Sequence, residues 1–186
     1  EPNVAILLPL IWEKTNHCII KLSPMLDISQ AISELKFCKE VHVVSVNNEC
    51  KELLFLLEKG FKAEPMIKTV NLKNDSKEEF QFLFSDEKKQ ASPFSQPLKY
   101  LYEPNASILK AGAFKIITEN YPLQKLAKHT HLYTSNELLS NFPGRKLFVK
   151  ELLKPQKGLI ERVNIVTRNF PLKPEQLKKK YKIKDG

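Results

Sequence analysis

The fold class predicted by this sequence is α/β, with a mainly parallel first sheet followed by a smaller α+β region. Three observations lead to this prediction. Helical and strand patterns alternate over the first 60 residues, as in doubly wound sheets. Two alternating segments separated by a short polar stretch then indicate a hairpin. Finally, the charge changes sharply near residue 98, which suggests that the two parts have different roles.

The first five elements are predicted from apolar periodicity and capping residues. We expect a helix over 2–13, a mostly buried strand over 17–22 and a helix that a capping box opens at Asp27. The β-branched run 41–46 is typical of a parallel strand buried on both faces. Asn47 and Asn48 are interpreted as caps of a further helix over 49–58, ended by Gly60.

The following segments predict a change of architecture. Strands are expected over 66–72 and 79–84, joined as a hairpin, and the polar stretch 86–97 with its two prolines is expected to be a linker or surface loop. Residues 102–118 predict one helix that starts at Pro104 and carries Gly112 at its middle, where another backbone would pack closely. Strands are also predicted over 130–134, 146–153 and 161–168, together with a short helix from Thr134 to Leu139 and a basic helix that starts at Pro174.

The basic charge is concentrated in the second half of the chain. Residues 1–98 carry 12 Lys/Arg and 14 Asp/Glu, a net of −2, whereas residues 99–186 carry 18 Lys/Arg and 7 Asp/Glu, a net of +11. A basic half beside a balanced one favours a polyanionic partner, and a lysine-rich solvating surface is the alternative. The candidates for phosphate contact are Lys110, Lys115, Lys125, Lys128, Arg145, Arg162 and Arg168, with Lys146 and Lys178–Lys180 as further members. Tyr102, Tyr133, Phe148 and Phe170 are candidates for stacking on single-stranded RNA, with core packing as the alternative.

A candidate pocket wall follows from the expected strand ends. Ligands of open α/β sheets bind beyond the carboxyl ends of the strands. Two buried strands are expected to end in polar loops, so these loops would line one crevice if the strands are neighbours. The residues concerned are Ser23, Pro24, Asp27, Asn47, Asn48 and Glu49. The alternative is that they only cap helices, and for Asp27 capping alone is a sufficient explanation.

Several other sites are not supported by the sequence. His129 and His131 could form half of a metal site, but no third ligand is evident, so no metal is predicted. The chain contains no Walker loop, nucleophile elbow or Gly-x-Gly-x-x-Gly motif, and no catalytic residue is assigned. Three cysteines without a Cys-x-x-Cys pair suggest buried thiols in a reducing cytoplasm. No apolar run is long enough to suggest a membrane partner.

Six stretches resemble one family of bacterial proteins. They are Lys-Leu-Ser-Pro-Met-Leu-Asp-Ile (21–28), Val-His-Val-Val-Ser-Val-Asn-Asn-Glu-Cys-Lys-Glu-Leu (41–53), Tyr-Glu-Pro-Asn-Ala-Ser-Ile-Leu-Lys-Ala-Gly-Ala (102–113), Thr-His-Leu-Tyr-Thr-Ser (130–135), Phe-Pro-Gly-Arg (142–145) and Thr-Arg-Asn-Phe-Pro (167–171). The family comprises proteins of the class I S-adenosylmethionine-dependent methyltransferase type with a C-terminal THUMP-like domain. The resemblance extends over nearly all of the 186 residues.

The resemblance implies a domain organisation. Residues 1–62 would be the C-terminal part of a Rossmann-like methyltransferase domain, 63–101 a ferredoxin-like hairpin segment with a linker, and 102–186 a basic THUMP-like domain. It also implies that the chain is a fragment, starting in the helix before the fifth strand of the methyltransferase sheet. The cofactor loop, the ribose-binding acid and the Asp-Pro motif would then lie upstream. S-adenosylmethionine is therefore expected in the parent protein and not on this fragment.

The leading functional expectation is the C-terminal portion of a methyltransferase that acts on RNA, either tRNA or rRNA, with the basic module holding the substrate. The expected location is the cytoplasm, and no oligomeric state is assigned. One alternative is a binding module without catalysis, attached to a degenerate Rossmann remnant. The other is a protein interaction domain whose lysines only increase solubility.

Overall fold

The computed structural model describes residues 3–186 and begins with three elements that follow the prediction. Helix α1 spans Val4–Lys14, strand β1 spans His17–Leu22 and helix α2 spans Ile28–Glu34. Asp27 caps α2 through its side chain, which accepts a hydrogen bond from the Gln30 backbone N–H at 2.9 Å. Pro2, where the first helix was expected to start, lies outside the described residues.

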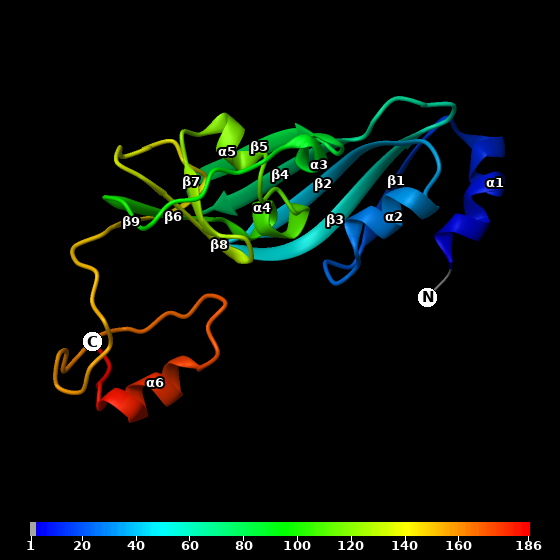
Figure 1. Ribbon diagram of the computed structural model, residues 1–186. Coiled ribbons are helices and arrows are strands. Elements are labelled where there is room, and N and C mark those ends of the chain that lie inside the picture. Colours follow the sequence, from blue (N-terminus) through cyan, green and yellow to red (C-terminus); the bar gives the residue numbers. More distant parts are fainter. Residues whose placement is uncertain (1–2) are drawn as a thin grey trace.

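The first sheet has five strands in the order β1-β3-β2-β4-β5 (Figure 1). Strands β2 and β4 are parallel, and the other neighbouring pairs are antiparallel. The later strands are β2 (Cys38–Val46), β3 (Glu49–Glu58), β4 (Met66–Lys73) and β5 (Ser76–Leu83). The predicted hairpin is confirmed, but β4 pairs with β2, so this hairpin belongs to the first sheet. A domain boundary at residue 62 would divide that sheet.

The helix expected over 49–58 is a strand, which is the largest error in this region. Asn47 and Asn48 both have positive φ angles, 48° and 64°. A two-residue hairpin turn of type I′ needs two such residues, and asparagine tolerates this conformation. The chain therefore reverses at once, and β3 pairs antiparallel with β2 instead of continuing as a helix.

The core of the first sheet lies on one face. Cross-strand register places Ile20, Phe55, Val41, Ile67 and Phe82 in one row across the five strands. All five are buried in a cluster with residues of α1 and α2. The opposite face is partly open, and Ile19 is 67% exposed there. The expectations that the strand over 17–22 is mostly buried and that the strand over 41–46 is buried on both faces are therefore wrong, because the hairpins leave one side of the sheet uncovered.

The stretch 102–118 forms a strand and two short helices. Strand β6 (Tyr100–Pro104) comes first, Asn105 caps helix α4 (Ala106–Ala111), and α5 (Ile117–Asn120) follows. Gly112 has φ +74°, the left-handed conformation that commonly ends a helix. The predicted single helix is wrong because its central glycine is a helix end and Pro104 closes a strand.

The second sheet is antiparallel, in the order β7-β8-β6-β9. Its further strands are β7 (Gln124–Ala127), β8 (Thr130–Ser135) and β9 (Gly144–Phe148). Strand β8 confirms the prediction for 130–134, but its continuation to Ser135 removes the helix expected from Thr134. Ser135 Oγ accepts a hydrogen bond from the Glu137 N–H in a local turn.

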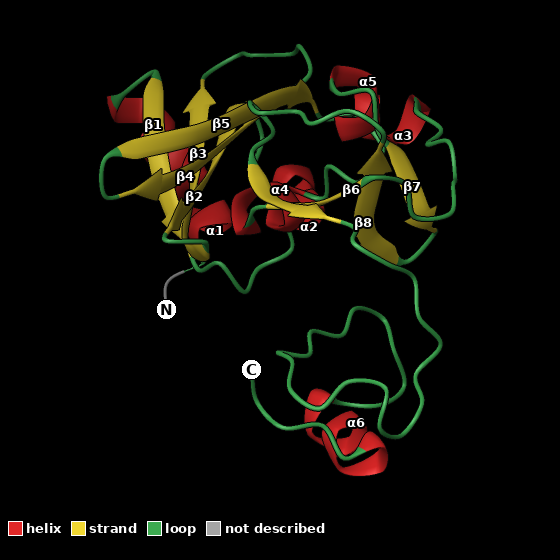
Figure 2. Cartoon of the chain, turned by 90° about the vertical axis from the view of Figure 1, so that its left-hand side faces the viewer, coloured by secondary structure: helices red, strands yellow, loops and turns green. Residues whose placement is uncertain are grey.

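The C-terminal region, residues 149–186, is connected to the second sheet through an irregular segment that follows β9 (Figures 1 and 2). Residues 149–173, all of which are described, form no regular helix or strand, so the strand predicted over 161–168 is wrong. An isolated bridge joins Arg162 to Lys184 instead. The strand predicted over 146–153 ends at Phe148. Helix α6 (Pro174–Tyr181) confirms the predicted basic helix.

The short helix α3 (Asp86–Lys89) lies within the stretch expected to be a linker. Among the helices formed by residues 3–186, none has the length and apolar character that crossing a membrane would need.

Candidate functional site

The loops after β1 and β2 lie at the same end of the first sheet. Both strands are antiparallel to β3, so their carboxyl ends point the same way. Helix α4 contacts both loops. Lys110 Nζ donates to the Leu26 carbonyl at 2.8 Å, and Asn48 Oδ1 accepts from the Ala106 N–H at 2.8 Å. The two predicted loops are therefore connected through α4.

The predicted pocket-wall residues do not all share one cavity. Ser23 and Pro24 line a cavity of about 540 Å³ together with Lys51 and Glu52. Asp27 lines a different cavity of about 340 Å³ beside α2. Asn47, Asn48 and Glu49 line neither of these two cavities. The two cavities adjoin, since Val4, Leu22 and Leu26 line both, but the loop over 47–49 lies outside them.

Asn48 belongs to a polar network between the two sheets. Its backbone N–H donates to Asn71 Oδ1 at 2.9 Å, and Asn71 Nδ2 donates to Glu78 Oε2 at 3.0 Å. Asn105 Nδ2 donates to the same oxygen at 3.0 Å. Burial raises the pKa of Glu78, but hydrogen bonds from Lys73, Asn71 and Asn105 outweigh burial, so the net pKa is lowered. Asn48 therefore positions α4 against the first sheet.

Arg145 and Arg168 meet on one buried carboxylate. Glu103, in β6, is 8% exposed and pairs with Arg145 Nη1 at 3.4 Å and with the Arg168 guanidinium through its other oxygen. A Cβ at Gly144 would lie 2.2 Å from the Glu103 carbonyl oxygen, so glycine is needed for the close approach of β9 to β6. The arginine side chains are 53% and 42% exposed, so this carboxylate holds two accessible cations side by side.

The other predicted cations are dispersed. Lys125 is 4% exposed, and its Nζ donates to the Lys128 carbonyl at 2.8 Å. Burial lowers the pKa of Lys125. Its side chain is held inside the second sheet, which corrects the expectation of a surface phosphate contact. Lys115 Nζ donates to the Lys88 carbonyl at 3.4 Å, and Arg162 Nε donates to the Asp185 carbonyl at 3.1 Å.

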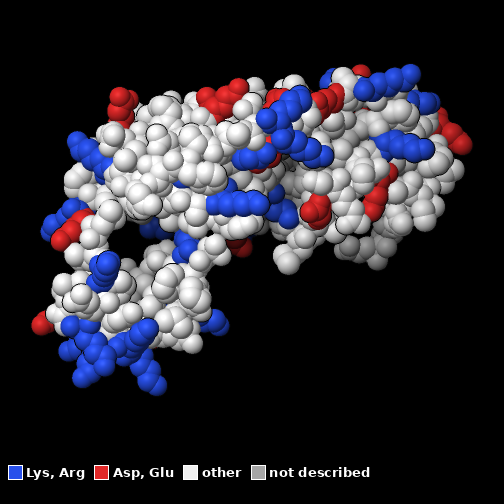
Figure 3. Space-filling view, viewed as in Figure 1, with Lys and Arg blue, Asp and Glu red and all other residues white. Residues whose placement is uncertain are grey.

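The exposed lysines of α6 form the densest basic cluster visible in Figure 3. Lys178, Lys179 and Lys180 lie in its last turn, where positive charge interacts favourably with the helix dipole. Lys178 also pairs with Asp185. Elsewhere in this view, basic and acidic side chains are interspersed.

The predicted aromatic stackers divide into two groups. Tyr102 and Tyr133 are fully buried, so core packing accounts for them. Phe148 and Phe170 are 63% and 53% exposed and remain accessible.

His131, a candidate metal ligand, stacks on Phe114 at a centroid separation of 3.9 Å. Burial lowers the pKa of His131, and the positive charge of Lys125 lowers it further. The described residues contain no cluster of three or more potential metal ligands.

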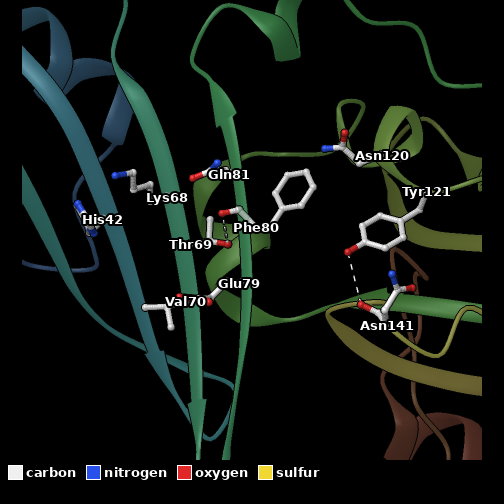
Figure 4. A pocket seen from close by; sticks show the side chains of 10 residues that line it. All are labelled: His42, Lys68, Thr69, Val70, Glu79, Phe80, Gln81, Asn120, Tyr121 and Asn141. Atoms are coloured by element: carbon white, nitrogen blue, oxygen red, sulfur yellow. Dashed lines mark hydrogen bonds between the residues drawn. The ribbon is translucent and has the colours of Figure 1, made fainter.

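Sequence reasoning missed a groove between the two sheets (Figure 4). A cavity of about 670 Å³ lies there, lined by His42, Lys68, Thr69, Val70, Glu79, Phe80, Gln81, Asn120, Tyr121 and Asn141. Its two walls come from residues 42–81 and from residues 120–141, so only the packing of the sheets brings them together. Phe80 and Tyr121 join the walls with ring centroids 6.5 Å apart.

Comparisons with known proteins identify two domain types and one structural neighbour. Residues 100–143 match a ferredoxin-like domain, and residues 140–186 match a THUMP domain-like family. The crystal structure of a protein described as a putative methyltransferase from Porphyromonas gingivalis W83 is similar, with a TM-score of 0.81 and 33% identity. That match covers 96% of this chain and 48% of the other, so the chain spans about half the length of its neighbour. No curated protein matches.

These findings refine the predicted organisation. The ferredoxin-like match starts at β6 rather than at the β4–β5 hairpin, where the expected segment 63–101 lay. The THUMP-like match includes β9, which pairs with β6 of the ferredoxin-like match. The chain therefore contains a mixed α/β first sheet, a ferredoxin-like domain and a THUMP-like domain, and its solved neighbour carries a methyltransferase description.

Proposed function

We propose that this chain is the substrate-binding portion of an S-adenosylmethionine-dependent methyltransferase that acts on RNA, such as tRNA or rRNA. The observation that carries the proposal is the solved neighbour, which matches nearly the whole chain at 33% identity. The THUMP domain-like match over 140–186 supports RNA as the substrate class. The exposed arginines on Glu103 and the lysines of α6 supply cations for phosphate contact.

The chain's own contribution is to hold and orient the substrate. Methyl transfer from a sulfonium requires a nucleophile held in line with the methyl group, so positioning provides much of the rate. No described glycine lies in the loops after β1 and β2, so these loops offer no glycine-rich cradle for the cofactor. We therefore derive no step through S-adenosylmethionine on these residues. Its binding is assigned to the parent protein.

RNA binding is tested with fluorescein-labelled bulk tRNA and the 186-residue chain. We expect affinity to fall steeply between 50 and 200 mM salt, because bound phosphates release counterions. The double substitution Lys179→Glu and Lys180→Glu should weaken binding at least tenfold. The matched control is Lys36→Glu with Lys62→Glu, which makes the same charge change on exposed residues of the first sheet region. Equal losses of tRNA affinity in both variants would show that net charge alone accounts for the effect, whatever the position of the lysines.

Catalysis is tested on the parent protein with radiolabelled S-adenosylmethionine and total RNA. Label transfer that the α6 substitutions reduce supports the proposal. RNA binding without label transfer or cofactor binding would instead favour a non-catalytic binding module. Absence of salt-dependent RNA binding would favour a protein interaction domain.

A further inference from the structure

A single charged contact holds the C-terminal region against the second sheet. Arg168, in the irregular segment before α6, forms an ion pair with Glu103 of β6. Among the residues that the structure describes, no other side-chain ion pair or hydrogen bond joins residues 149–186 to the rest of the chain. The cavity within this region, of about 210 Å³, is lined by its own residues between Leu153 and Ile183. The Arg168–Glu103 ion pair therefore fixes how the region lies on the second sheet.

Arginine is rare in this chain, yet two arginines meet at this carboxylate. Of the 30 Lys and Arg residues, only Arg145, Arg162 and Arg168 are arginines. Arg145 pairs with one oxygen of Glu103, and Arg168 pairs with the other. A guanidinium presents five N–H donors in a planar fork that matches two oxygens of a phosphate, whereas a lysine ammonium acts as a point charge. The fold therefore brings together the side chains that are best suited to bind a phosphate.

Glu103 leaves part of both guanidiniums free. Its buried carboxylate accepts from Nη1 of Arg145 at 3.4 Å and from the Nε side of Arg168. Nε and Nη2 of Arg145 donate to no acceptor among the described residues. Two guanidiniums on one carboxylate leave a net charge of +1, and both arginine side chains reach the surface. Because Glu103 already orders these side chains, an anion that binds them costs less conformational entropy.

The neighbouring charges favour an anion at this cluster. Lys146 donates through Nζ to two backbone carbonyls and pairs with no described carboxylate, so it contributes a further positive charge on β9. Glu78, which accepts a hydrogen bond from Asn105, is balanced by its ion pair with Lys73. Residues 149–186 carry 11 Lys/Arg and 4 Asp/Glu, a net of +7. The charges on both sides of the cluster are therefore net positive, which attracts a polyanion.

We propose that Arg145 and Arg168 together bind one phosphate group of the RNA substrate, and that Glu103 is the positioning residue that holds them for it. Glu103 lies in the ferredoxin-like match and both arginines lie in the THUMP-like match, so the site forms only when the two domain types are joined. Phe170, two residues after Arg168, is more than half exposed and offers a ring on which a neighbouring base stacks. This inference deepens the proposed function and rests on it.

The first test is Glu103→Gln in the 186-residue chain, with affinity for fluorescein-labelled bulk tRNA measured by fluorescence anisotropy. The substitution removes a negative charge, so attraction by net charge alone would leave tRNA binding unchanged or strengthen it. We expect the affinity to fall about fivefold or more, because the two arginines are no longer held together. Glu40→Gln is the matched control, since Glu40 also holds two basic side chains, Lys68 and His42, but on the first sheet. Its loss should not weaken binding.

A second variant keeps the charge and removes the geometry. Arg145→Lys with Arg168→Lys changes two side chains that are about half exposed, so the fold should be retained. We expect tRNA affinity to fall about fivefold or more at unchanged net charge, because lysine lacks the planar fork. Arg162→Lys is the matched control and should bind like the wild type, because Arg162 donates to the Asp185 carbonyl, outside the cluster. Urea denaturation verifies folding, and the double variant decides the question even if Glu103→Gln does not fold.

The source of the phosphate is determined with single-stranded RNA of about 12 nucleotides, with and without a 5′-phosphate. If Glu103→Gln weakens binding of both RNAs equally, the bound group is an internal phosphodiester. If it weakens only binding of the phosphorylated RNA, the bound group is the chain end, and either result supports the site. A wild type that binds no RNA would overturn the proposed function and this inference with it. If the wild type binds RNA but the double lysine variant, or a folded Glu103→Gln variant, binds equally well, this inference alone is overturned.

Discussion

The first sheet and the C-terminal region differ in how their residues are held. In the first sheet, Val41, Leu53 and Phe55 are completely buried. In the region 149–186, Leu177 is buried, whereas Leu152, Val166 and Phe170 are more than half exposed. Burial of apolar surface stabilises the first region, and local capping and charge organise the second. We call the first sheet with α1 and α2 the platform, because its core is tightly packed. We call residues 149–186 the basic attachment, because this region is rich in lysine and few of its apolar side chains are buried.

The largest expected effect tests the packing of the platform. Phe55→Ala removes a fully buried ring and should destabilise the protein by about 3–5 kcal/mol. Leu177→Ala should cost less than about 2 kcal/mol, because the exposed loops around α6 can close over the space. Urea denaturation monitored by circular dichroism measures both. Equal losses would show that the C-terminal region is packed as tightly as the sheet.

The next effect concerns the joint between the two domain types. Gly144→Ala places a Cβ against the Glu103 carbonyl and should cost about 1–3 kcal/mol through steric overlap. Gly158→Ala is the control, because that residue also has positive φ, +77°, but its Cβ would meet no atom within 4 Å. A difference in the free energy of unfolding between the two variants isolates the clash. If both lose the same stability, the strand contact contributes little.

A smaller effect should appear as a pH dependence of platform stability. The folded pKa of Glu78 lies below its unfolded value of about 4.3, so its stabilisation is present above that pH and is lost as the pH falls. Stability should decrease from about pH 5 to pH 3, and Glu78→Gln should flatten part of this decrease. Denaturation at several pH values measures the slope. An unchanged slope in the variant would contradict the role of the Asn71–Glu78–Asn105 contact.

The smallest expected effect is on the basic attachment. Lys179→Ala should change the free energy of unfolding by less than about 0.5 kcal/mol, because the side chain is exposed. Its affinity for tRNA should nevertheless fall, which would separate binding from stability. A thermal melt and a binding titration on the same sample provide the two measurements. A large shift of the melting transition would contradict this separation.

Several elements could be predicted because their signals are local. Asp27 with Gln30 marks the start of α2, and Pro174 marks the start of α6. The β4–β5 hairpin follows from alternation on both sides of a polar turn. Predictions were wrong where a residue type suits two different local structures. Asn47 and Asn48 suit either a helix cap or a type I′ turn, and Gly112 suits either a close packing contact or a helix end.

The candidate sites show the same limit. Charge asymmetry indicated a basic half, but it could not distinguish Arg145 and Arg168, which share Glu103, from the buried Lys125. The groove between the two sheets left no local signal. Its lining residues are ordinary strand and loop residues until the sheets meet.

The sequence alone determined the starts of α2 and α6, the β4–β5 hairpin and the position of the basic half, because neighbouring residues set backbone preference and charge. The tertiary structure decided that 49–58 is a strand, that the first sheet is covered on one face, and that two distant walls enclose a groove. Those outcomes depend on which strands pair and which side chains share a core, so they follow from contacts between residues far apart in the chain.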